Sequence, residues 1–206
     1  MADRLGPVLE RGQRLGFLGP APIGEHVEHS RRLVRLLGAP PASFLDLGSG
    51  AGVPGLILAE AWPEASGVFL DAAHRRGEHL QAASAELGLA DRVTVVVARA
   101  EDAARDPHWR ERFELVVARS FAAPAVTAEC AVGFLAPNGR LLVTEPPGGG
   151  AAGRWDDAGL ARLGLSPPTL LIDGSTSVAV FRRVGPLDDR WPRRTGVPER
   201  RPLWGG

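Results

Sequence analysis

Between Ser43 and Glu145 the chain alternates short, continuously apolar runs with segments of helical pattern. The apolar runs are 44–47, 68–70, 93–97, 115–118 and 141–144. Strands that are apolar at every position are buried on both faces, which is typical of a parallel sheet covered by helices. The intervening segments compatible with helices are 55–60, 75–87, 105–112 and 126–135. This alternation predicts a doubly wound α/β sheet.

The chain beyond Glu145 predicts a different ending to the sheet. Three glycines at 148–150 predict a flexible joint, and residues 156–163 predict one more helix. Two further strand-like runs, 169–172 and 178–181, are separated only by a short turn sequence, so we expect an antiparallel hairpin. The whole pattern predicts a seven-stranded, mostly parallel sheet whose last strand is antiparallel.

The length of 206 residues is enough for one domain with a sizeable core. Residues 1–43 are a short helical N-terminal preface, in which Gly6-Pro7 predicts a break and 23–37 predicts the main helix. Residues 44–184 form the sheet domain. Residues 185–206 form an Arg- and Pro-rich tail that we expect to be extended.

Charge and composition exclude several classes of protein. The 24 basic and 24 acidic residues leave no net charge, so nucleic acid would have to bind a local patch. The chain has no lysine, and the guanidinium of arginine suits bidentate contacts with phosphate or a guanine edge. A single cysteine, Cys130, excludes a disulfide framework, and His26 and His29 lack a third ligand, so no metal is expected. No apolar run suits a membrane span or signal peptide, so we expect a cytoplasmic protein.

The first predicted strand leads into a glycine-rich turn. Gly50, Gly52 and Gly55 match G-x-G-x-x-G, the pattern of dinucleotide sites, because glycine lets the backbone turn sharply and lie against a ligand. Two residues argue against a nicotinamide dinucleotide. Asp46 would repel a pyrophosphate, and Pro54 lacks the backbone donor that a phosphate would use. The acid before the turn instead suits a ligand with a cationic amino-acid end.

Acidic residues follow three successive predicted strands. They are Asp46, Asp71 and Glu101, and the carboxyl ends of parallel strands meet at one edge of a sheet. The carboxylate of Asp71 suits the two hydroxyls of a ribose, and Glu101 suits the edge of an adenine. Together with the glycine-rich turn, these acids predict a binding site for S-adenosylmethionine.

Four segments resemble one family of methyltransferases. Residues 46–55 are similar to motif I of class I methyltransferases. Residues 26–30, 117–122 and 190–203 are similar to signatures of the RsmG (GidB) family, the last being Arg-Trp-Pro-Arg-Arg-Thr-Gly-Val-Pro-Glu-Arg-Arg-Pro-Leu. The resemblance implies a single-domain, Rossmann-like class I methyltransferase that uses S-adenosylmethionine. It also implies N7 of a guanine in 16S ribosomal RNA as the acceptor and the small ribosomal subunit as a partner.

The same resemblance implies which residues hold the cofactor. Matched by position, Gly48, Val53, Ala100, Glu101 and Arg119 would contact it. Guanine N7 already carries an in-plane lone pair, so the reaction needs alignment more than acid–base chemistry. We expect Arg119, after the fourth strand, to lie between cofactor and base as the catalytic residue. The complete predicted cofactor set is Asp46, Gly48, Gly50, Gly52, Val53, Asp71, Ala100, Glu101 and Arg119.

Departures from the family pattern bear on the acceptor. Glu145-Pro146 stands where the family has Lys-Gly, Thr176 where it has Arg before the last strand, and Glu25 where it has Arg ahead of the histidines. Lost cations weaken phosphate contacts, and Glu145 would add repulsion. The arginines that remain as predicted RNA contacts are Arg75, Arg76, Arg193 and Arg194.

Two alternatives therefore stay open. One is a divergent class I methyltransferase that acts on a small molecule or another RNA, which the substitutions at Glu145 and Thr176 favour. The other is a cofactor-binding partner of the ribosome without turnover.

Overall fold

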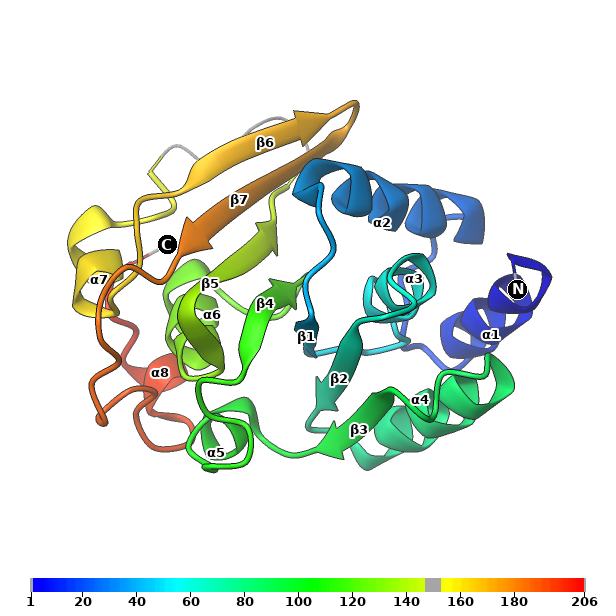
Figure 1. The fold of residues 1–206 in the computed structure, drawn as a ribbon, viewed down its shortest axis with the longest axis horizontal. Helices are drawn as coiled ribbons and strands as arrows, with labels where there is room; N and C mark the ends of the chain where they lie inside the picture. Colours follow the sequence, from blue (N-terminus) through cyan, green and yellow to red (C-terminus); the bar gives the residue numbers. More distant parts are fainter. Residues whose placement is uncertain (1, 147–152, 206) are drawn as a thin grey trace.

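The computed structural model describes residues 2–146 and 153–205. It contains a seven-stranded sheet in the order β3-β2-β1-β4-β5-β7-β6 (Figure 1). Strands β1 to β5 pair in parallel, and β7 runs antiparallel to both of its neighbours, which confirms the predicted fold class. The strands are β1 (Ser43–Leu47), β2 (Ser66–Asp71), β3 (Val93–Val97), β4 (Phe113–Ala118), β5 (Leu135–Thr144), β6 (Thr169–Asp173) and β7 (Thr176–Arg182).

Helices cover both faces of the sheet and bury a separate core against each. One core joins the side chains of α1 (Ala2–Arg14), α2 (Ile23–Leu37), α3 (Gly55–Ala61) and α4 (His74–Glu86) to one face of the sheet. The other core joins α5 (Ala100–Ala103), α6 (Pro124–Val132), α7 (Asp157–Arg162) and the tail to the opposite face. The last helix is α8 (Val197–Arg200).

The two cores explain why the strands are apolar at every position. Side chains alternate between the faces of a strand, so Phe44 packs in the core on the α1–α4 side while Leu45 and Leu47 pack in the other. By the same alternation Asp46 lies on the α1–α4 side of β1. The strand order reverses between β1 and β4, and ligands of such sheets bind outside the carboxyl ends of the strands at that point.

Two predictions about helices near the ends of the sheet were wrong. The break expected at Gly6-Pro7 does not occur: Pro7 lies inside α1 and removes one helical hydrogen bond, but the burial of Val8 and Leu9 offsets this loss. Segment 105–112 forms turns, while the short helix lies earlier, at α5. The proline at 107 disfavours helical backbone at the residue before it, which explains the difference.

The second half of the sheet also differs in detail. Helix α6 ends at Val132, and β5 already begins at Leu135, with an irregular register against β4 between Phe113 and Leu115. The predicted hairpin is confirmed, since Asp173 pairs with Thr176 across its turn. The glycine joint predicted at 148–150 lies outside the described residues.

The tail is not extended throughout, although the sequence predicted an extended tail. It contains the single-turn helix α8, which packs against α6, and the side chain of Trp191 is only 2% exposed. The C-terminal tail therefore belongs to the core beside α6 and α7, as Figure 1 shows.

Candidate active site

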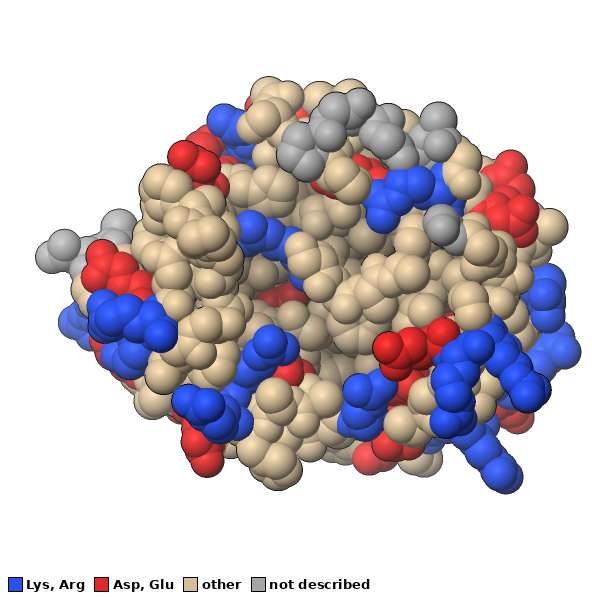
Figure 2. All heavy atoms as spheres, turned by 180° about the vertical axis from the view of Figure 1, so that it is seen from behind, with Lys and Arg blue, Asp and Glu red and all other residues tan. Residues whose placement is uncertain are grey.

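Two cavities lie side by side at the carboxyl edge of the sheet. The first has a volume of about 700 Å³ and the second about 740 Å³. Ser120, Phe121 and Ala122, which follow β4, line both of them. Figure 2 shows one face of the molecule hollowed near its middle, with basic and acidic side chains around the hollow. If each cavity held a ligand, only this short shared wall would separate the two ligands.

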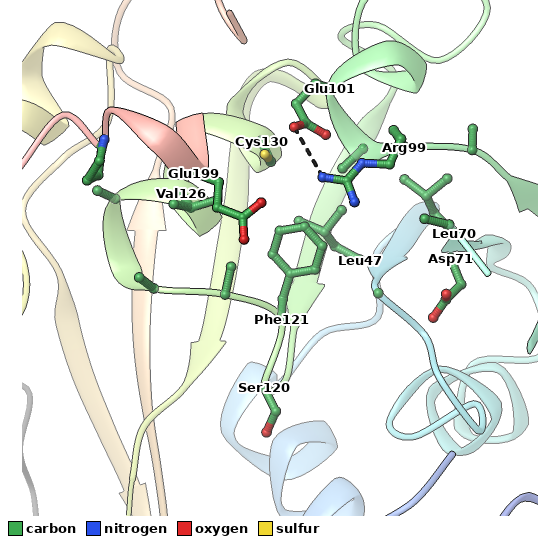
Figure 3. A pocket seen from close by; sticks show the side chains of 18 of the residues that line it. Leu47, Leu70, Asp71, Arg99, Glu101, Ser120, Phe121, Val126, Cys130 and Glu199 are labelled. Carbon is green, nitrogen blue, oxygen red and sulfur yellow. Dashed lines mark ion pairs between the residues drawn. The ribbon is translucent and has the colours of Figure 1, made fainter. Parts of the chain in front are cut away.

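The first cavity gathers residues from the ends of β1, β2 and β3. Gly48, Asp71, Ala100 and Glu101, all predicted cofactor residues, line it. The tail supplies a further wall through Glu199, Pro202, Trp204 and Gly205. In Figure 3 the carboxylates of Asp71 and Glu199 lie to either side of the Phe121 ring.

Asp71 is the acid that both faces the first cavity and shapes it. Its Oδ2 accepts a hydrogen bond from the backbone N–H of Gly50 at 2.9 Å, and its Oδ1 accepts from Ala73 at 3.0 Å. Arg76 lies 3.5 Å from the same Oδ2. Oδ2 thus accepts from both Gly50 and Arg76, whereas Oδ1 keeps a lone pair that can accept from a ligand hydroxyl. The predicted ribose contact is therefore compatible with this geometry.

The glycine-rich turn needs backbone conformations that other residues avoid. Gly48, Gly50 and Gly52 have φ values of 75°, 57° and 92°. A Cβ atom at Gly48 would lie 2.6 Å from the ring of Phe121 in the shared wall. A side chain there would collide with the shared wall.

Asp46 lies apart from both cavities. Its Oδ2 accepts a hydrogen bond from the backbone N–H of Gly55 at 2.9 Å, and the residue is 1% exposed. Burial raises the pKa of this carboxyl to about 7. The carboxyl therefore holds the start of α3 against β1. Gly50, Gly52 and Val53 also do not line either cavity.

Glu101 lines the first cavity, but its carboxylate is already engaged. Oε1 accepts from the backbone N–H of Gly196 at 2.8 Å and lies 3.5 Å from Arg99. The second of these contacts is the dashed line in Figure 3. Glu101 thus joins the first cavity to the tail, a contact between residues far apart in the sequence.

Arg119 lines the second cavity, and not the first. His26 Nε2 donates to the carbonyl of Gly19 at 3.1 Å, so His26 Nδ1 is free to accept from Arg119 Nη2 at 2.8 Å. Arg119 Nη1 is buried without a hydrogen-bond partner among the described residues. Burial lowers the pKa of Arg119, and the nearby Asp46 partly offsets this. The structure therefore places a partly desolvated guanidinium, held by a histidine, beside the shared wall.

His29 lies near Arg119, on the same helix as His26. Its Nδ1 is 3.1 Å from the hydroxyl of Thr176. Burial, followed by the positive charges of Arg119 and Arg32, lowers the pKa of His29 to about 4. The ring is therefore neutral at physiological pH.

Glu145 does not present the unpaired negative charge that the sequence suggested. It lines the second cavity, but its side chain is fully buried. One carboxylate oxygen pairs with Arg154, and the other accepts from the indole N–H of Trp155 at 2.8 Å. The prediction that Glu145 repels RNA was therefore wrong, because Arg154, nine residues further along, neutralises the carboxylate.

The four arginines predicted to contact RNA differ in their surroundings. Arg75 and Arg194 are exposed. Arg76 is near Asp71, and Arg193 donates from Nε and Nη2 to the fully buried carboxylate of Glu129, at 2.8 and 2.6 Å. Arg193 therefore has its guanidinium engaged within the protein.

Sequence reasoning missed the roles of several site residues. His26 was considered as a metal ligand and not as a partner of Arg119, and neither Arg154 nor Glu199 was singled out. The family-like tail sequence was the one signal available for Glu199. No sequence pattern marked Arg154 as the partner of Glu145, although the two are nine residues apart.

Two further observations concern metals and membranes. Across residues 2–146 and 153–205, no group of three or more His, Cys, Asp or Glu side chains is arranged to hold a metal ion. Within the same residues, no helix has the length and apolar character needed to cross a membrane.

Comparison with known proteins identifies relatives of this chain. Residues 21–145 match the family model GidB, described as rRNA small subunit methyltransferase G. Ribosomal RNA small subunit methyltransferase G of Synechococcus sp. (strain RCC307) is 35% identical over 79% of this chain and 71% of that protein. The protein of the same name from Roseiflexus sp. (strain RS-1) is 35% identical over 88% of this chain and 79% of that protein.

Solved structures share the fold at lower identity. The O-methyltransferase from Bacillus cereus in complex with SAH superposes with a TM-score of 0.63 at 16% identity, covering 89% of this chain and 91% of that chain. The mitomycin 7-O-methyltransferase MmcR gives a TM-score of 0.61 at 16% identity, covering 76% of this chain and 53% of that chain. These likenesses concern the fold alone.

Proposed function

We propose that this chain, which belongs to the GidB family of small-subunit rRNA methyltransferases, transfers a methyl group from S-adenosylmethionine to small-subunit ribosomal RNA. The acceptor atom would be N7 of a guanine. The observation that carries the proposal is the pair of cavities that share the wall Ser120–Ala122, in a chain of this family. Such an acceptor would also place the activity in the cytoplasm, as the sequence predicts.

The first cavity fits the cofactor. It has room for an adenosine joined to an amino acid, and Oδ1 of Asp71 offers a lone pair to a ribose hydroxyl. Gly48 would let the ligand lie against the backbone, and Ala100 and Glu101 would line its adenine. When bound, S-adenosylmethionine supplies an electrophilic methyl group on a sulfonium.

The second cavity fits the acceptor base. Guanine presents N7 and O6 on one edge, and an arginine guanidinium is a common partner for that edge. Arg119 would donate to O6 of this edge and leave the N7 lone pair free, and His26 would fix the orientation of its guanidinium. N7 carries a lone pair and no proton, so the residues of this chain need only align the base and exclude water. Arg119 is thus proposed as the residue that orients the acceptor beside the shared wall.

The substitutions at Glu145 and Thr176, which favoured a different acceptor, are less unfavourable for RNA than the sequence suggested. Glu145 is paired with Arg154 and presents no unpaired charge to the second cavity, and Thr176 is buried against His29 and does not line that cavity. Small ribosomal subunits therefore remain the acceptor that the site supports best.

The test uses purified protein, methyl-labelled S-adenosylmethionine, and small ribosomal subunits from a strain that lacks guanine-N7 methylation. We expect label at N7 of one guanine, and no label on large subunits under the same conditions. A protein that binds S-adenosylhomocysteine by calorimetry but labels neither subunit would refute the proposed acceptor. Failure to bind S-adenosylhomocysteine would refute the cofactor assignment as well.

A further inference from the structure

We propose that Arg154 and Arg32 form a phosphate clamp at the second cavity, which holds the backbone of the acceptor strand on either side of the target nucleotide. The inference rests on the proposed function, since it assumes that the acceptor is a polynucleotide. Both residues line the second cavity, together with Arg119. They come from elements far apart in the sequence, α2 and the segment before α7.

In the ion pair of Glu145 and Arg154, the guanidinium is partly exposed and the carboxylate is buried. The side chain of Glu145 is 0% exposed, whereas that of Arg154 is 31% exposed. The indole of Trp155 donates to the second carboxylate oxygen, so both oxygens of Glu145 are occupied. A ligand in the cavity would therefore meet the guanidinium rather than the carboxylate.

The backbone of Arg154 is held as well as its side chain. The indole N–H of Trp204 in the tail donates to the carbonyl of Arg154 at 3.1 Å. An arginine whose backbone and guanidinium are both held in place loses little conformational entropy when it binds an anion. This is the arrangement expected of a preformed phosphate contact.

Arg32 is fixed in a comparable way from α2. Its Nη1 donates to the hydroxyl of Ser175, in the turn between β6 and β7, at 2.7 Å. Its Nε lies 3.4 Å from Glu28, a carboxylate that also pairs with Arg35 at 3.0 Å. The side chain of Arg32 is 26% exposed. Like Arg154, it is held by protein partners and keeps part of its surface open.

Three glutamates and three arginines line the second cavity, so the arginines act through their placement rather than through an excess of positive charge. Glu145 is buried in its pair, and Glu28 is shared between two arginines. Glu25 also lines the cavity and is exposed. Planar guanidinium groups bind phosphate oxygens through two parallel hydrogen bonds. Since the whole chain has no net charge, such local contacts are what a polyanion would need.

The experiment replaces the ion pair without changing the net charge. Removing Arg154 alone would leave a buried carboxylate unpaired, so the test variant is Glu145→Gln with Arg154→Gln. The amide introduced in place of the Glu145 carboxylate keeps an oxygen that can accept from Trp155. The matched control is Arg182→Gln, because Arg182 is an exposed arginine outside both cavities. Binding to small ribosomal subunits is measured across a series of salt concentrations, and binding of S-adenosylhomocysteine is measured by calorimetry.

For the double variant we expect about tenfold weaker binding to small subunits and a slope of log K against log salt that is shallower by about 1. Its affinity for S-adenosylhomocysteine should equal that of the unchanged protein, which shows that it is folded. Subunit binding and a salt slope equal to those of the unchanged protein would overturn the clamp. Equal losses in the double variant and in Arg182→Gln would also overturn it, because they would indicate a general charge effect. Absence of subunit binding by the unchanged protein would instead overturn the proposed function, and the clamp with it.

Discussion

Arg193 decides whether the tail is an RNA-binding arm or a structural part of the domain, so its replacement is the most informative test of stability. Glu129 is 0% exposed on α6, and Arg193 provides all three of its hydrogen bonds among the described residues. Two come from the guanidinium and one from the backbone N–H. Arg193→Ala would leave the buried carboxylate with the backbone donor only.

The magnitude follows from the burial of the pair. Removing one partner of a buried ion pair costs about 3–5 kcal/mol, because the other charge stays buried and uncompensated. The side chain of Arg193 is 25% exposed, so water can partly replace it. Its guanidinium also lies 5.7 Å from the ring centre of Trp191, a contact worth about 0.5–1 kcal/mol. We therefore expect Arg193→Ala to lower the free energy of unfolding by about 2–4 kcal/mol.

The assay is equilibrium unfolding in urea, followed by tryptophan fluorescence. The matched control is Arg194→Ala, because Arg194 is the adjacent, exposed arginine and should change stability by less than about 0.5 kcal/mol. Adding Glu129→Gln to Arg193→Ala should restore part of the loss, since the variant then buries no charge. A loss no larger for Arg193→Ala than for Arg194→Ala would refute the structural role. In that case Arg193 would again be a candidate for contact with RNA.

Three further predictions concern the cavities and the carboxyl edge of the sheet. Asp71→Ala should weaken binding of S-adenosylhomocysteine at least about tenfold by calorimetry, because hydrogen bonds to a charged group are worth about 1.5–3 kcal/mol; unchanged affinity would contradict the ribose contact, and the exposed Asp91→Ala is the control. Asp46 has a pKa of about 7 in the folded protein against an ordinary value of 3.8, so its contribution to stability is greatest below about pH 4 and declines as pH rises to 7. Asp46→Asn should lack this decline in urea unfolding measured across that range, and pH profiles parallel to those of the unchanged protein would contradict the assignment. His29 has a pKa of about 4 against 6.5, so acidification from pH 6.5 to 4 should destabilise the protein through this ring. His29→Gln should reduce that loss, and an equally steep loss in the variant would show that another group causes it.

The sequence alone determined the layered fold and the edge of the sheet where the cavities lie. Continuous apolar strands separated by helical segments allow few arrangements, because each strand must be buried on both faces. The glycine-rich turn and Asp71 also followed from local pattern, since backbone conformation and strand ends are properties of neighbouring residues. These features depend on residues close together in the chain.

Local pattern predicted the number of strands correctly but was wrong about two of the helices. Pro7 was expected to break α1, yet the helix continues because the side chains around the proline are buried against α2 and α4. Tertiary burial outweighed a local preference at this position.

Only the tertiary structure decided which charges are available to a ligand. Asp46, Glu101 and Arg193 have the residue types expected of ligand contacts, but each is engaged with a partner in the protein: Gly55, Gly196 and Glu129 respectively. Likewise, the sequence suggested that Glu145 repels RNA, whereas the structure shows it paired with Arg154. The free energy of a charged group depends on its burial and its nearest opposite charge. Burial is set by elements that meet only in the folded chain, so no local pattern could have revealed which of these charges are hidden from a ligand.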